Sequence, residues 1–244
     1  MKLFMIIVIS LLFACSSEEP QLNKNGDPPD HPLKGLPDNG PIRFDDPQIG
    51  QRSHYVFFKA TENNNTHEIN FDYFPDTLVL AITGKEADKW IVKEFLTNGS
   101  NSKNSADGVW TTFALSVLVR HLRVNADSAY FSKPDGAADP FSFVFARESR
   151  TIPLKPVGDP APLNVSCLPK IDYASTLWME YTVDYSQFGQ TFQHLNNYFD
   201  YRPMATDGSG VMYAYSPSFG LVRCTWVNYW ELDYALGWDL IPNP

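Results

Sequence analysis

The sequence has no hydrophobic run long enough to cross a bilayer as a helix. Its longest run, Leu3–Ala14, is interrupted only by Ser10, and a spanning helix needs about 20 apolar residues. The run follows a basic start, Met1–Lys2. A charged start before a short apolar run is typical of a secretory signal. We therefore expect an exported chain whose residues 1–14 are a signal peptide.

Cysteine is scarce, with 3 among 244 residues. Cys15 ends the apolar run, and polar residues follow it at once. The stretch Leu12–Cys15, LFAC, resembles the lipobox of bacterial lipoproteins, although Phe13 is bulkier than usual there. The resemblance implies that Cys15 is lipidated, so that acyl chains such as palmitate anchor the protein to a membrane. An ordinary signal peptide with a cysteine there by chance is the alternative.

The residues after Cys15 bear on localisation. Ser16 stands where an aspartate would imply retention at the inner membrane, and Glu18–Glu19 resembles an acidic export signal of some lipoproteins. The resemblance implies the cell outer membrane, with surface exposure favoured over a periplasm-facing position.

Cys167 and Cys224 are the other two cysteines. In an oxidising compartment an even pair of this kind predicts a disulfide. The alternative is two buried thiols that pack as small apolar side chains.

The chain also has fewer basic than acidic residues. The chain has 19 Lys and Arg against 28 Asp and Glu, a net charge of -9. This balance argues against a nucleic-acid partner or an anionic lipid surface.

Residues 15–41 contain little apolar material and many Pro, Gly, Asn and Asp residues. Such a segment cannot bury enough surface to offset its ordering entropy, so we expect a disordered, flexible tether. Residues 42–244 are expected to form a single domain.

Short runs rich in β-branched and aromatic residues, separated by turn sequences, predict an all-β domain. The expected strands are Ser53–Ala60, Thr77–Thr83, Val109–Val119 and Thr176–Tyr185. Lys85–Leu96 fits a helix or a strand, and strand is favoured. The prolines of Pro153–Pro169 exclude a regular helix. The expected fold is an antiparallel sandwich or a strongly curved sheet or half-barrel. Tyr215–Arg223, YSPSFGLVR, resembles the ends of uncharacterised all-β bacterial lipoprotein domains, some of them half-barrels that hold apolar ligands.

Catalytic motifs are missing. No HExxH, HxH, CxxC, GxSxG or phosphate-binding glycine loop occurs, and the 5 histidines are scattered. Carboxylate pairs such as Asp45–Asp46, Glu231 with Asp233, and Glu180 with Asp184 are best explained as solvated side chains. We therefore expect no catalytic residue, no metal and no cofactor.

Aromatic residues are concentrated near the C-terminus, where they predict either a core or a binding platform. The candidate platform is Trp226, Tyr229 and Trp230. The leading hypothesis is a lipid-anchored lipoprotein whose non-catalytic β-domain binds a glycan or an envelope protein. The alternatives are a carrier of lipid or another apolar ligand in a half-barrel, and a hydrolase with an unrecognised site.

Overall fold

The computed structural model describes residues 32–62, 66, 69–97, 117–135, 149–155, 177–201, 209–228 and 234–242. These residues form strands and no helix, and none of their segments is a helix that could cross a membrane. The strands are β1 (Arg52–Glu62), β2 (Ile69–Glu86), β3 (Lys89–Leu96), β4 (Leu118–Val124), β5 (Ser128–Phe131), β6 (Arg150–Pro153), β7 (Leu177–Gln187), β8 (Gln190–Tyr201), β9 (Ser209–Ser216), β10 (Gly220–Asn228) and β11 (Tyr234–Ile241).

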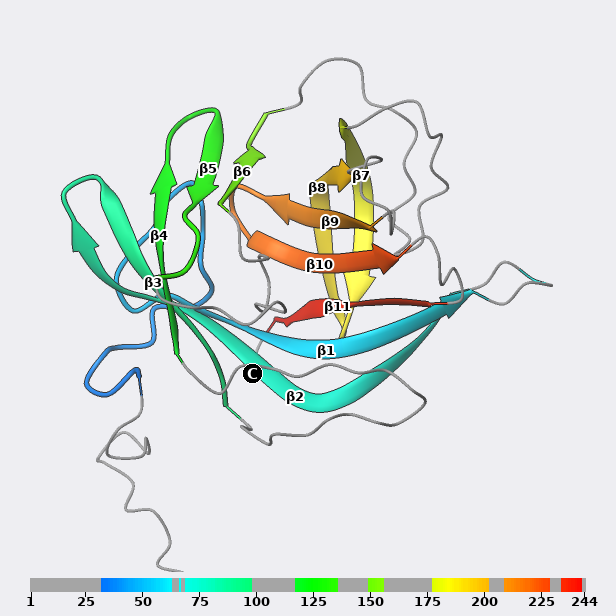
Figure 1. Cartoon of the computed structure of the whole chain (residues 1–244), viewed down its shortest axis with the longest axis horizontal. Coiled ribbons are helices and arrows are strands. Elements are labelled where there is room, and N and C mark those ends of the chain that lie inside the picture. Colours follow the sequence, from blue (N-terminus) through cyan, green and yellow to red (C-terminus); the bar gives the residue numbers. More distant parts are fainter. Residues whose placement is uncertain are drawn as a thin grey trace, which may run out of the picture. The chain divides into compact units, whose positions relative to one another are not determined.

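One antiparallel sheet contains all of these strands, in the order β6-β5-β4-β3-β2-β1-β11-β10-β9-β8-β7. The first six strands run outward from the middle of the sheet to the β6 edge. The last five begin at the β7 edge and return to the middle, where β11 pairs with β1 (Figure 1). The domain is therefore held together at its centre by a pairing between distant parts of the sequence.

Two hydrogen bonds show how strongly this sheet curls. The Tyr215 hydroxyl of β9 donates to the carbonyl of Pro153 in β6, and Asn196 Nδ2 of β8 donates to the carbonyl of Leu154, just after β6, at 3.3 Å. These strands lie near opposite edges of the sheet, so they meet only because the sheet curls into a half-barrel. Of the two architectures predicted from the sequence, the strongly curved sheet is the one observed.

The concave face of the sheet is filled with large side chains. They are almost fully buried, and several are aromatic: Phe44, Tyr55, Phe57, Phe192, Tyr213, Tyr215 and Trp238. Phe57 of β1 and Trp238 of β11 pack with ring centroids 5.0 Å apart. Burying one such side chain contributes about 1.5–3 kcal/mol, so these aromatic residues contribute much of the stability of the core.

The segment before β1 packs onto the turn between β9 and β10. The Phe44 and Asp45 amides both donate to the Pro217 carbonyl, at 2.8 and 2.9 Å. Ile42 and Phe44 are buried in the core cluster. The compact unit that contains the sheet begins at Leu36.

Most of the strand predictions that fall on described residues are confirmed. Ser53–Ala60 lies within β1 and Thr77–Thr83 within β2. Lys85–Leu96 is strand, as favoured, although it contains a turn at Ala87–Asp88 that divides β2 from β3. Thr176–Tyr185 corresponds to β7 from Leu177 onward. Most of Val109–Val119 and of Pro153–Pro169 lies outside the described residues, as do the signal peptide and most of the predicted tether.

Candidate functional site

The predicted aromatic platform falls mostly outside the described residues. The backbone of Trp226 lies in β10, paired with Val211 on one side and Leu236 on the other. Its side chain, and the whole of Tyr229 and Trp230, are not among the described parts. The platform therefore stays a prediction.

Three other C-terminal aromatics belong to the core. Tyr213, Tyr215 and Trp238 have 0% exposure and line the core cluster. For these three residues the core interpretation of the C-terminal aromatics is the correct one.

Of the three cysteines, Cys224 is the one that lies among the described residues. Cys15 and Cys167 lie outside the described residues, so the lipidation and the disulfide both stay predictions. Cys224 lies in β10 and is fully buried. Burial raises the pKa of its thiol, and the nearby Glu94 carboxylate raises it further, while Arg150 opposes the shift. A thiol with a raised pKa is a poor nucleophile at neutral pH.

Glu94 is itself part of a buried ion pair inside the curled sheet. Arg120 Nε lies 2.7 Å from Glu94 Oε2, and both side chains have 0% exposure. A second guanidinium nitrogen of Arg120 donates to the Ser132 carbonyl at 3.2 Å. The pair links β3 to β4, and each charge is compensated by the other.

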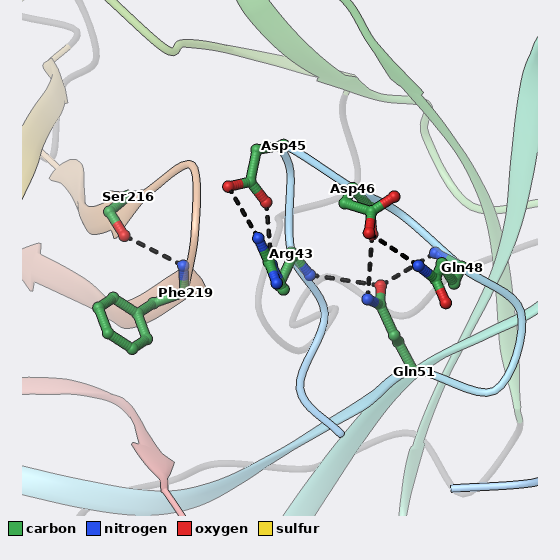
Figure 2. Close-up of polar contacts among 7 residues, drawn as sticks. All are labelled: Arg43, Asp45, Asp46, Gln48, Gln51, Ser216 and Phe219. Carbon is green, nitrogen blue, oxygen red and sulfur yellow. Dashed lines mark hydrogen bonds and ion pairs between the residues drawn. The ribbon is translucent and has the colours of Figure 1, made fainter. Parts of the chain in front are cut away.

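The Asp45–Asp46 pair is occupied by structural contacts. Figure 2 shows the Asp45 carboxylate facing Arg43, with Nε–Oδ1 and Nη2–Oδ2 distances of 3.0 and 3.1 Å. Asp46 accepts a hydrogen bond from Gln48 Nε2 at 2.7 Å, and its carbonyl accepts one from the buried Gln51. The two carboxylates therefore serve different partners within one loop. For Glu180 and Asp184 only the backbone is described, and Glu231 and Asp233 lie outside the described residues.

Among the described residues, no group of three or more His, Cys, Asp or Glu side chains is placed to hold a metal ion. His54 is partly buried, and burial lowers its pKa against the opposing effect of Asp38. His121 Nε2 lies 3.9 Å from Glu86 Oε2. Neither histidine has the shared ligands that a zinc site requires.

A cluster of aromatic and charged side chains, called here the aromatic–ionic cluster, is contributed by β1, β2, β10, β11 and the turn between β7 and β8, and part of it is exposed to solvent. We use this name for Phe58, Phe71, Tyr73, Phe188, Arg223 and Asp239. At its base Arg223 and Asp239 form a bidentate pair, with Nε–Oδ1 and Nη2–Oδ2 distances of 2.5 and 2.6 Å. Their side chains are 3% and 0% exposed. Bidentate geometry of this kind is the strongest form of the interaction.

Aromatic rings surround this ion pair. The guanidinium carbon of Arg223 lies 4.5 Å from the ring centroid of Phe71 and 5.0 Å from that of Phe58. The Tyr73 hydroxyl donates to Asp239 Oδ2 at 2.9 Å. Burial raises the pKa of Tyr73, and the neighbouring Asp239 charge raises it further. Tyr73 is therefore a neutral hydrogen-bond donor at physiological pH.

The exposed part of the cluster consists of Tyr73 and Phe188. These side chains are 42% and 47% exposed. Their ring centroids are 5.1 Å apart at an interplanar angle of 59°. Tyr73 comes from β2 and Phe188 from the turn between β7 and β8, which is coloured yellow in Figure 1. Two distant parts of the sequence thus present adjacent aromatic rings to solvent.

Sequence reasoning missed this cluster. One signal for its base is a single charge within an apolar strand, as at Arg223 in GLVRCTWV and Asp239 in LGWDLI, since charges are rarely buried unless paired. A signal for its exposed part is the Phe188–Gly189 dipeptide between two strands. A turn at this place usually has Asn-Gly or Asp-Gly, so a phenylalanine there is unexpected.

No family model and no curated protein matches the chain. Among solved structures it has a weak match to a domain from Vibrio parahaemolyticus described as a candidate outer membrane lipoprotein-sorting protein. The identity is 9%, the alignment covers 78% of this chain and 83% of that one, and the TM-score is 0.19. A TM-score this low does not establish a shared fold.

Proposed function

We propose that the protein is a lipid-anchored lipoprotein of the outer membrane, displayed at the cell surface, whose β-domain is a non-catalytic binding module. The expected partner is a glycan or another envelope protein. The lipobox-like sequence at Leu12–Cys15 supports the anchor. The observation that supports binding is the exposed Tyr73–Phe188 ring pair, which stands on a buried ionic base.

This arrangement suits recognition because the exposed Tyr73 ring is held in place before a ligand arrives. The Tyr73 hydroxyl donates a hydrogen bond to Asp239, which accepts another from Arg223, and the Phe188 ring packs against Tyr73. A preorganised site avoids much of the entropy cost of ordering side chains on binding. Strands rather than long loops supply five of the six cluster residues, which favours accurate placement.

Changing Cys15 to Ser should abolish attachment to the outer membrane. The variant has no thiol for the acyl chains, and a chain held by two or more of them binds membranes stably. After cell fractionation, we expect wild type in the outer membrane and Cys15→Ser absent from it, as an unlipidated precursor that keeps residues 1–14. Cys167→Ser is the control and should remain in the outer membrane. Recovery of Cys15→Ser in the outer membrane at the wild-type level would refute the anchor.

A second candidate function is the carriage of lipid or another apolar ligand. The curl of the sheet favours it, because half-barrels can enclose such molecules. The buried rings of Tyr213 and Trp238 would then have to move aside to admit the ligand. This function predicts lipid in the protein released from its membrane, seen by native mass spectrometry after detergent removal. Repeated preparations without bound lipid would exclude it.

A further inference from the structure

The turn between β7 and β8 has an unfavourable residue at its tip. Phe188 and Gly189 connect paired Gln187 and Gln190, and both have positive φ, at 48° and 76°. A two-residue hairpin turn of this kind favours Asn, Asp or Gly at its first position. A bulky aromatic residue at positive φ is a genuine outlier. Because backbone strain tends to persist where it serves function, the identity of residue 188 needs an explanation.

The strained turn puts the Phe188 ring beside Tyr73. Gln187 Nε2 donates to the Leu240 carbonyl at 3.0 Å, so the tip of the hairpin is attached to β11. The Phe188 ring packs against Tyr73 with ring centroids 5.1 Å apart, and this contact offsets part of the strain. The ring is nevertheless 47% exposed, so nearly half of its surface faces solvent and is open to a ligand.

Neutral polar groups accompany the rings. The hairpin tip Ser186–Thr191, SQFGQT, has no charged residue. Ser186 Oγ and Thr191 Oγ1 are exposed and lie 2.8 Å apart, and Gln190 Nε2 donates to the Thr191 carbonyl at 3.1 Å. The tip thus combines an apolar ring with hydroxyl and amide groups that donate and accept hydrogen bonds.

We propose that Tyr73 and Phe188 form a platform for the sugar rings of a neutral glycan. Sugars present apolar C–H faces, which stack on aromatic rings, and hydroxyl groups, which bond to neutral polar side chains. The polar residues that flank Phe188 in the sequence are Ser186, Gln187, Gln190 and Thr191, and of these Gln187 is buried. This inference rests on the proposed binding function and names its ligand class.

The size of the exposed patch favours a glycan over a protein. A stable protein interface covers about 800 Å² on each partner. The large hydrophobic side chains that are well exposed in the described part of the chain are Ile49, Tyr73, Val117 and Phe188. Tyr73 and Phe188 pack against each other, so the patch consists of two aromatic rings. Two adjacent rings match one or two sugar units, and the uncharged tip matches a neutral polymer.

The test compares stability with binding in full-length protein extracted in detergent. Affinity electrophoresis in gels that contain dextran, mannan, starch, xylan or hydroxyethylcellulose identifies a bound polysaccharide. Phe188→Asn should raise the midpoint of thermal unfolding, because asparagine suits the turn. The same change should weaken binding at least tenfold, because the ring is lost. Phe188→Trp should retain binding, since it keeps an aromatic face.

Val117→Asn is the matched control, because it replaces another exposed hydrophobic residue, 39% exposed, and should bind like wild type. Wild-type affinity in Phe188→Asn would overturn the inference. If Trp226→Ala or Trp230→Ala loses binding instead, the inference fails and the proposed function stands. If no polysaccharide binds but an envelope protein crosslinks to the domain, the inference of a glycan ligand fails and the proposed binding function stands. If neither partner binds, both proposals fail.

Discussion

Replacing Arg223 with methionine is expected to lower the free energy of unfolding by about 3–5 kcal/mol, because it leaves a buried carboxylate without its counter-ion. Asp239 has 0% exposure and accepts two hydrogen bonds from the guanidinium group. The Tyr73 hydroxyl is a neutral donor and cannot compensate the charge. Methionine fills a similar volume between Phe58 and Phe71, so the loss would report mainly the unpaired charge.

Urea denaturation followed by tryptophan fluorescence measures this effect. The double variant Arg223→Met/Asp239→Leu should recover much of the loss, since it buries no charge. Arg43→Met is the control for loss of an ion pair, because the Arg43–Asp45 pair is solvent-exposed and such pairs contribute little. If Arg223→Met unfolds at the same urea concentration as wild type, the aromatic–ionic cluster has no stable ionic base.

Replacing Gly237 with alanine is expected to destabilise the domain by about 1–3 kcal/mol or more, because a methyl group has no room there. A Cβ at Gly237 would lie 2.5 Å from Phe58 Cζ and closer still to the carbonyl oxygen of Cys224. Phe58 is fully buried, and the carbonyl belongs to the paired strand β10. The clash therefore falls at the junction where β1, β11 and β10 join the two halves of the sheet.

Gly84→Ala is the matched control for this strand glycine. Its Cβ would meet Ile91 Cδ1 at 3.2 Å, and the end of an isoleucine side chain can move. Thermal unfolding should show a clear loss for Gly237→Ala and a small change for Gly84→Ala. Equal effects of the two substitutions would contradict the close packing of β11 against Phe58.

Local sequence patterns predicted the strands better than their arrangement. A short run of apolar and β-branched residues, such as Thr77–Thr83, is enough to predict a strand. The curl of the sheet depends instead on contacts between distant segments, such as the bond from Tyr215 to Pro153. No short stretch of sequence contains both residues, so the local pattern alone does not distinguish a sandwich from a half-barrel.

The turn that divides Lys85–Leu96 shows a second limit of local patterns. Ala87 has a φ of 52°, and alanine gives no sign of a left-handed turn in the way that glycine or asparagine would. The apolar spacing across the turn therefore resembled a helix as much as a strand.

The candidate site was hidden for a similar reason. Tyr73 and Phe188 are far apart in the sequence, and neither belongs to a known motif. Their contact requires the β7–β8 hairpin to reach β2, and their support comes from Arg223 and Asp239 on two further strands. Trp226, Tyr229 and Trp230 were predicted as a platform because they lie close together in the sequence. The residues of the aromatic–ionic cluster come from four separate strands and a turn, so no short stretch of sequence contains them together.

Mass spectrometry of the mature N-terminus tests the central claim most directly, because display of the β-domain at a membrane depends on the modification of Cys15. The protein would be extracted from outer membranes and digested, and the N-terminal peptide would be recovered in an organic phase. We predict a peptide that begins at Cys15 and carries a diacylglyceryl group on the thiol and an acyl group on the new amine. A peptide that begins elsewhere, or that contains Cys15 without acyl chains, would contradict the account.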